Sequence, residues 1–308
     1  MITDIPSPQD FTDQGLTLLN ISWETVVDPM RAMIEVVDGE GFLDNEEKEI
    51  HAKAMQRPLA IASALLQQGA EFLVKAAISK ISPLLLISAN SEQWKRYGSH
   101  PTPFYSVRTL DAQDLLSVHN AIARTPFSTA FMQRFIASRE IRNTVFHNVD
   151  RKRQFSVNDV LLAILEFTTE LHGPGTWLDD RRRYLETTPT GAINADCVQC
   201  IIAAEFDLLR KILGKSHLKR HFSFDKTQRC YRCLNCHYQC GDFFTSPMPM
   251  TAKLLSSTSQ SSAVQCVVCR TTFKVSRRKC TSCRGNVICD EPDFDTECLS
   301  CGANNEYD

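Results

Sequence analysis

Arg142 and His147, in the run Ile141-Arg-Asn-Thr-Val-Phe-His147, are the residues whose types and spacing best suit them to chemistry. Histidine titrates near neutral pH, so it can take the proton of a ribose 2′-hydroxyl. Arginine stays charged and presents a planar fork of N–H donors, so it can stabilise a phosphoryl group under attack. Because the 2′-hydroxyl is itself the nucleophile, this pair predicts RNA cleavage without a catalytic metal.

The spacing of the pair limits this interpretation. On an ideal helix, residues five apart lie about 140° apart around the axis. Arg142 and His147 therefore share a face only if the helix is distorted or the arginine side chain reaches across it. Asn143 lies closer to the histidine and can orient it or contact phosphate. An arginine and a histidine at this spacing also occur in helices without any catalytic role.

The sequence pattern of residues 1–214 predicts an all-α bundle, and it contains no series of strands. Pro58 is expected to bend or divide the first clear helix, and Ser156, followed by Asp159, is expected to begin the fourth. The run from Leu16 to Val37 is apolar but has no clear pattern. The expected helices cover residues 44–80, 110–122, 128–147, 157–171 and 194–214.

The helical region contains motifs that resemble those of the HEPN family of ribonucleases. Arg142-Asn143-Thr-Val-Phe-His147 is similar to the family's motif of an arginine, a polar residue, three further residues and a histidine near a helix end. Upstream, Gly69-Ala-Glu71 resembles its Gly-x-Glu helix, and Ser82-Pro-Leu-Leu-Leu-Ile87 follows in the family's style. The resemblance covers about residues 45–172.

This resemblance implies a helical bundle, a homodimer or higher oligomer with two motifs across one cleft, and metal-independent endoribonuclease activity. It assigns His147 as general base or acid, Arg142 as the phosphate clamp and Asn143 as a polar helper. Glu71 becomes a candidate for orienting the arginine, and a structural salt bridge is an equally good interpretation of it. The family further suggests a toxin or antiviral-defence effector, with an antitoxin or defence-system partner. The substrate stays open among tRNA, ribosomal RNA and messenger RNA.

Residues 215–308 contain four Cys-x-x-Cys pairs. Two such pairs complete one tetrahedral zinc site, so the sequence predicts two structural Zn²⁺ ions in two consecutive zinc ribbons. All-thiolate sites leave no open position for water, so no catalytic metal is expected. The first ribbon is expected to use Cys233, Cys236, Cys266 and Cys269, and the second Cys280, Cys283, Cys298 and Cys301.

The remaining cysteines leave alternatives open. Cys230 can replace Cys236 in an overlapping pair, and Cys197 and Cys200 are expected to be buried thiols rather than a third metal site. Other residues near the ribbons that can ligate a metal are His237, Cys240 and Cys289.

The ribbon region is strongly basic although the whole chain has a formal net charge of -2. Residues 215–284 carry thirteen Lys or Arg and two acids, Asp225 and Asp242, whereas residues 290–308 form an acidic tail. The basic charge favours nucleic-acid binding over protein docking. Aromatic residues expected to stack on unpaired bases are Tyr231, Tyr238, Phe243, Phe244 and Phe273.

Thirteen cysteines, an odd number, together with the lack of an export signal, favour zinc thiolates in a reducing cytoplasm over disulfides. No apolar run is long enough to span a bilayer, so no membrane association is expected. Two hypotheses follow. One is an endoribonuclease whose ribbons hold RNA or a partner, and the alternative is a non-catalytic dimeric adaptor that binds nucleic acid or protein.

Overall fold

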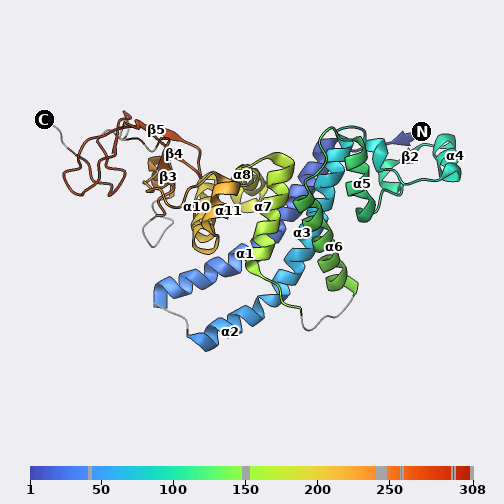
Figure 1. The fold of residues 1–308 in the computed structure, drawn as a ribbon, viewed down its shortest axis with the longest axis horizontal. Helices are drawn as coiled ribbons and strands as arrows, with labels where there is room; N and C mark the ends of the chain where they lie inside the picture. The colour runs from blue at the N-terminus through green and yellow to red at the C-terminus, as the bar shows by residue number, and fades with distance from the viewer. Residues whose placement is uncertain are drawn as a thin grey trace. The chain divides into compact units, whose positions relative to one another are not determined.

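The computed structural model describes residues 1–40, 44–147, 153–240, 248–256, 258, 260–292, 294 and 296–305. The chain divides into two compact units, Met1–Pro174 and Gly175–Asp308 (Figure 1). Most described residues are helical, and a small sheet with two cysteine clusters lies in the second unit. The fold class predicted from the sequence is therefore correct in its coarse form.

The first unit is a helical bundle with one short parallel strand pair, formed by β1 (Ile2–Thr3) and β2 (Thr102–Pro103). Its other elements are α1 (Pro8–Glu40), α2 (Asn45–Ala54), α3 (Gln56–Ser79), η1 (Pro83–Leu86), α4 (Ser91–Ser99), η2 (Phe104–Ser106), α5 (Ala112–Ile122), α6 (Thr129–His147) and α7 (Val157–His172).

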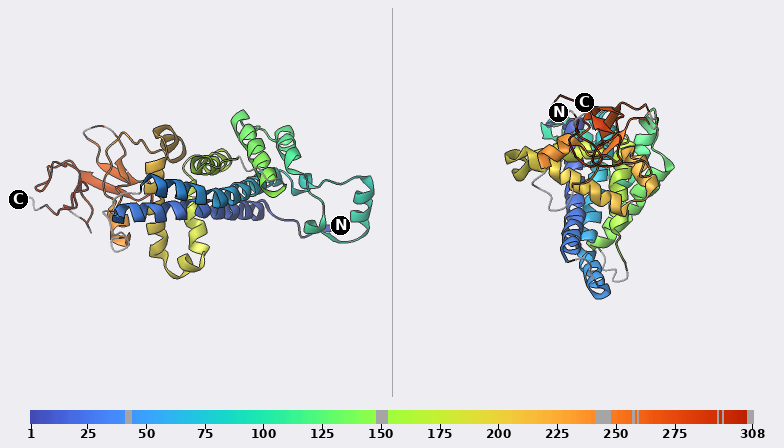
Figure 2. Two further views of the ribbon diagram at one scale, coloured as in Figure 1. Left: turned by 90° about the horizontal axis from the view of Figure 1, so that it is seen from below. Right: turned by 90° about the vertical axis from the view of Figure 1, so that its left-hand side faces the viewer.

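The helices α1 and α3 pack lengthwise against each other and form the centre of this unit (Figures 1 and 2). Two glycines allow their close approach. A Cβ atom added to Gly69 would lie 2.9 Å from the backbone oxygen of Gly15, and one added to Gly15 would lie 3.0 Å from that of Gly69. Contact this close leaves no room for any side chain at the crossing.

The observed helices refine the predicted ones. The segment 44–80 is two helices separated at Met55, and Pro58 lies in the first turn of α3, where a helix tolerates proline. The capping residue Ser156 begins α7 as expected. Three other predicted helices are observed as α5, α6 and α10 with ends shifted by one or two residues. The run from Leu16 to Val37, for which the sequence showed no clear pattern, lies within α1, and Pro29 lies inside this helix.

The second unit combines helices with an antiparallel sheet in the order β3-β4-β5-β6. Its helices are α8 (Trp177–Thr187), α9 (Pro189–Ile193), α10 (Ala195–Ile212), α11 (Lys215–Phe222) and α12 (Leu234–Cys240). Its strands are β3 (Ala252–Leu254), β4 (Ala263–Cys266), β5 (Thr272–Ser276) and β6 (Ile288–Cys289).

The boundary between the units differs from the one that composition predicts. Composition predicts a division of the chain after Gly214, whereas the boundary between the compact units falls between Pro174 and Gly175. The reason is packing: α10 contacts both α8 and α12, so these helices belong with the cysteine-rich region. In the described residues, no helix is both long enough and apolar enough to cross a membrane.

Candidate metal centres and the α6 motif

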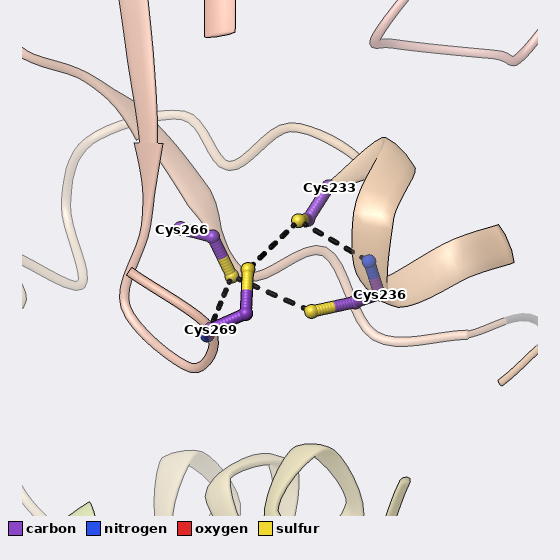
Figure 3. A group of neighbouring side chains, drawn as sticks. All are labelled: Cys233, Cys236, Cys266 and Cys269. Atoms are coloured by element: carbon purple, nitrogen blue, oxygen red, sulfur yellow. Dashed lines mark hydrogen bonds between the residues drawn. The ribbon is translucent and has the colours of Figure 1, made fainter. Parts of the chain in front are cut away.

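The first cysteine cluster contains Cys233, Cys236, Cys266 and Cys269, whose sulfur atoms lie within 4.8 Å of one another (Figure 3). Cys233 and Cys236 lie at the start of α12, while Cys266 ends β4 and Cys269 lies in the turn that leads to β5. Three of the four residues are buried. The sequence predicted this grouping of the two pairs.

The geometry of this cluster fits zinc. With Zn–S bonds of about 2.3 Å, the sulfurs of a tetrahedral site are separated by roughly 3.8 Å. The sulfurs of Cys236 and Cys266 are 3.7 Å apart, and those of Cys233 and Cys269 are 3.4 Å apart. One Zn²⁺ ion therefore fits among the four sulfurs with little adjustment.

The second cluster contains Cys280, Cys283, Cys298 and Cys301, again with all sulfurs within 4.8 Å. The sulfurs of Cys280 and Cys301 are separated by 3.7 Å, and those of Cys283 and Cys298 by 3.8 Å. Cys301 is exposed to solvent. No further group of three or more metal-ligating side chains is found in the part of the chain that the structure describes.

A left-handed residue follows the second cysteine in one pair of each cluster. Arg270 follows Cys269 with a φ of 63°, and Gly302 follows Cys301 with a φ of 82°. At Gly302, a Cβ atom would also overlap the guanidinium group of Arg232. Glycine is therefore favoured at 302, whereas Arg270 adopts the same left-handed turn with the strain of a non-glycine residue.

Backbone N–H groups point at the cysteine sulfurs in both clusters. The N–H of Val268 donates to Cys266 over 3.3 Å, and the N–H of Gly285 donates to the sulfur of Cys283 over 3.1 Å. Donors of this kind stabilise the thiolate form that a metal requires.

The pKa values within the first cluster move in opposite directions. Contact with Cys233, and then with Cys236, lowers the pKa of Cys269 far below its usual range. Contact with the thiol of Cys233, followed by contacts with Cys266 and Cys269, raises the pKa of Cys236, and burial raises it further. The four thiols therefore cannot all ionise side by side unless a cation compensates their charge.

The second cluster shows the same opposition. Burial by itself would raise the pKa of Cys280, but the N–H groups of Ser282 and Cys283 donate to its sulfur and lower the pKa to about 7. Partial desolvation of its sulfur, together with contact with Cys283, raises the pKa of Cys301 to about 12 although the residue as a whole is exposed. Ionisation is thus shared unequally among these thiols as well.

The other cysteines lie outside the two metal-ligating groups. Cys200 is buried, as expected, and its sulfur lies 3.8 Å from the backbone oxygen of Gln239, while Cys197 is only half-buried. Cys230 does not replace Cys236, whose sulfur completes the first cluster. The remaining two cysteines outside the groups are Cys240 and Cys289.

Two of the three predicted stacking residues that the structure describes are buried and cannot stack on bases. Tyr231 and Phe273 are buried, so the prediction that they stack on bases is wrong and they belong to the core. Tyr238 is 82% exposed and retains that potential. Phe243 and Phe244 lie outside the described residues.

Part of the basic charge is neutralised within the second unit. Arg232 lies 3.7 Å from a carboxylate oxygen of Glu297, and Arg270 lies 3.6 Å from one of Asp179. Other basic side chains remain exposed, and three of them lie on the short helix α11: Lys215, Lys219 and Arg220.

The helix α6 carries the predicted catalytic motif at its C-terminal end. Phe131, Phe135 and Ser138 mark its buried face, and Arg142 continues that face one turn later. Arg142 and Asn143 are both half-buried. His147 is the last residue of α6, and the placement of its side chain lies outside the described residues.

Arg142 resembles Arg210, Arg232 and Arg277 in the state of one guanidinium nitrogen. Its Nε atom is buried without a hydrogen-bond partner among the described residues. In contrast, Arg134 on the same helix donates from Nε to Glu166 over 2.7 Å, and the fully buried Arg181 pairs with Glu205 over 2.8 Å.

Glu71 lies on α3, where its carboxylate accepts a hydrogen bond from Nζ of Lys75 over 2.9 Å, one turn along the same helix. Both side chains are about nine-tenths buried. Of the two interpretations left open by the sequence, this pair is the structural salt bridge. In the described part of the chain, no hydrogen bond or ion pair joins Glu71 to Arg142.

A pocket of about 270 Å³ lies between α5 and α6. Its walls are mainly apolar, and Arg139 at its edge lies 3.4 Å from the side-chain oxygen of Gln113. Sequence reasoning missed this pocket because its walls come from two helices that approach each other only in the folded chain.

No family model, curated protein or solved structure matches this chain.

Proposed function

We propose that the protein binds two structural zinc ions and acts on RNA as a metal-independent endoribonuclease. The zinc part of the proposal is supported by two groups of four sulfurs at separations that suit a tetrahedral ion. Zinc in such sites joins chain segments that have few large apolar side chains of their own. It supplies folding free energy and takes no part in RNA cleavage.

The observation that carries the nuclease part is the state of Arg142. A buried Nε without a partner costs about 1–3 kcal/mol, and the paired Arg134 shows that this helix can satisfy an arginine with a carboxylate. Because no carboxylate partner of Arg142 lies among the described residues, this arginine is suited to an anion that comes from outside the chain, such as a phosphate of RNA.

The proposed reaction needs only side chains of this chain and the RNA itself. His147 takes the proton of the 2′-hydroxyl, whose oxygen attacks the adjacent phosphorus, and the P–O5′ bond breaks while the 5′-oxygen takes a proton from water. Arg142 donates to the phosphoryl oxygens as negative charge develops on them, and Asn143 contacts phosphate or orients the histidine. The product ends in a 2′,3′-cyclic phosphate. A homodimer that brings two motifs together stays a prediction, as does a role as a toxin or defence effector.

The test is cleavage of tRNA, ribosomal RNA and messenger RNA by the purified chain. We expect His147→Ala to lower the cleavage rate by about 10²–10⁴-fold while folding and RNA binding are retained, because general acid–base catalysis contributes about that factor. The matched control is His51→Ala in α2, which should cleave like the wild type. Cleavage is also expected to continue in EDTA for as long as the protein stays folded.

The alternative function is a non-catalytic adaptor in which the ribbons bind nucleic acid or a protein. The exposed basic residues of α11 are compatible with this role, because their charge can bind nucleic acid without the catalytic motif on α6. A wild-type chain that cleaves no RNA, alone or with a cell extract, would leave the adaptor as the better description.

A further inference from the structure

A buried glutamine of α10 contacts the first metal cluster. Gln199 is only 5% exposed, and its Nε2 atom donates to the sulfur of Cys236 over 3.0 Å. The spacing of the cysteines could not predict this contact, because Gln199 and Cys236 are distant in the sequence. The helix thus contributes to the cluster although it carries none of the four thiols.

The orientation of the Gln199 amide is set by Arg182 on α8. Nη1 of Arg182 donates to Oε1 of Gln199 over 2.6 Å. A guanidinium has donors and no acceptor, so the amide oxygen must face Arg182 and the amide N–H₂ must face the sulfur. Arg182 therefore donates a hydrogen bond to Gln199, and Gln199 in turn donates one to the sulfur of Cys236.

Arg182 also contacts the other half of the cluster. Its Nη2 atom donates to the backbone oxygen of Val268 over 2.8 Å, within the turn between Cys266 and Cys269. One arginine of α8 thus touches the turn of the second cysteine pair and orients the donor to the first pair.

The two clusters differ in the side chains that contact their sulfur atoms. In the first, hydroxyl oxygens of Thr251 and Thr271 lie 3.1 Å from the sulfur of Cys266 and 3.2 Å from that of Cys269, in addition to the Gln199 contact. Within the described residues, the sulfurs of the second cluster accept from backbone N–H groups, such as that of Gly285. Four thiolates around Zn²⁺ leave a net charge of about −2, which such donors stabilise.

The helices α8 and α10 are also joined independently of the cluster. Arg181, which precedes Arg182, forms a fully buried ion pair with Glu205 of α10. Neighbouring arginines of α8 therefore have different tasks: Arg181 holds α10, and Arg182 extends to the cysteines.

We propose that Gln199, oriented by Arg182, is a positioning residue of the first metal site and makes metal binding there part of the folding of α8 and α10. This proposal depends on metal binding by the cysteines and does not depend on RNA cleavage.

The test uses the full chain with Gln199→Leu, which removes the donor, and Gln199→Glu, which keeps a partner for Arg182 but offers no N–H to the sulfur. Zinc release is measured by competition with a coloured chelator. We expect one of the two zinc ions to bind about 10–100-fold more weakly and the other to bind as before, because loss of such contacts typically costs that factor. The matched control is Gln239→Leu on the exposed surface of α12, with wild-type release of both ions.

Two further readouts separate positioning from mere packing. In the Co²⁺-loaded protein, both variants should shift the thiolate-to-metal absorption bands, and Arg182→Met should shift them in the same direction because the amide loses its orientation. Cys266→Ser should lower the helical circular dichroism signal, whereas Cys301→Ser should leave it near the wild-type value.

Wild-type zinc release and unchanged Co²⁺ bands in both Gln199 variants would refute the proposal. Equal helical loss in the two cysteine variants would also refute it. If Gln199→Leu does not fold, the decision rests on Gln199→Glu and Arg182→Met.

Discussion

At the scale of single residues, the chain treats its arginines in different ways. Arg134, Arg181 and Arg182 have carboxylate, amide or carbonyl partners, whereas the buried Nε atom of Arg142 has none among the described residues. A group that is kept in such a state is typical of sites where function is favoured over stability. Arg142 therefore offers a test that links activity to folding.

We predict that Arg142→Met abolishes RNA cleavage and raises the free energy of unfolding by about 1 kcal/mol, because an unsatisfied polar group is replaced by an apolar one. Urea unfolding and the RNA assay measure the two effects. Arg134→Met is the matched control on the same helix, and it should lower stability because Glu166 loses its partner. Destabilisation by both variants would mean that Arg142 contributes to the fold in the ordinary way.

At the scale of elements, the crossing of α1 and α3 holds the first unit together. Gly15 and Gly69 meet there with each backbone close to the other. Gly69 and Glu71 form the motif that resembles the Gly-x-Glu helix of the HEPN family. The close approach of α1 is a physical reason for glycine at position 69. Glu71 itself stabilises α3 by its pair with Lys75.

We predict that Gly69→Ala lowers the free energy of unfolding by about 1–3 kcal/mol, the usual cost of overpacking, although alanine is the better helix former. Gly98→Ala in α4 is the matched control, because no atom lies within 4 Å of an added Cβ atom there. This control should be neutral or stabilising by up to about 1 kcal/mol. Thermal or urea unfolding of the two variants compares them, and equal effects would contradict the close crossing.

At the scale of the whole molecule, a net charge of -2 conceals a strong separation of charge along the chain. The region from 215 to 284 is basic and the last nineteen residues are acidic. Ion pairs such as Arg232–Glu297 use part of this charge internally, while α11 keeps exposed cations. RNA binding should therefore depend on the exposed cations of α11 rather than on the net charge of the chain.

We predict that RNA binding weakens steeply with salt, and that replacing Lys215, Lys219 and Arg220 by glutamine lowers the slope of log K against log salt. Each phosphate contact of a single strand contributes about 0.7 to this slope, so three lost contacts lower it by about 2. Filter binding at several salt concentrations measures the change. The matched control replaces Lys48 and Lys53 of α2, which are also exposed, and a loss of slope there as well would contradict a role specific to α11.

Local sequence patterns were enough to predict the two groups of four cysteines and the helices α2, α3, α5, α6, α7 and α10, whereas α1, α4, α8, α9, α11 and α12 were not predicted. A Cys-x-x-Cys pair or an apolar stripe is a local pattern, and its meaning does not depend on distant residues. The buried Nε of Arg142, the unit boundary after Pro174 and the contact of Gln199 with Cys236 came from the folded structure alone. These features depend on which side chains of separate elements meet when the helices pack, and no local periodicity records that.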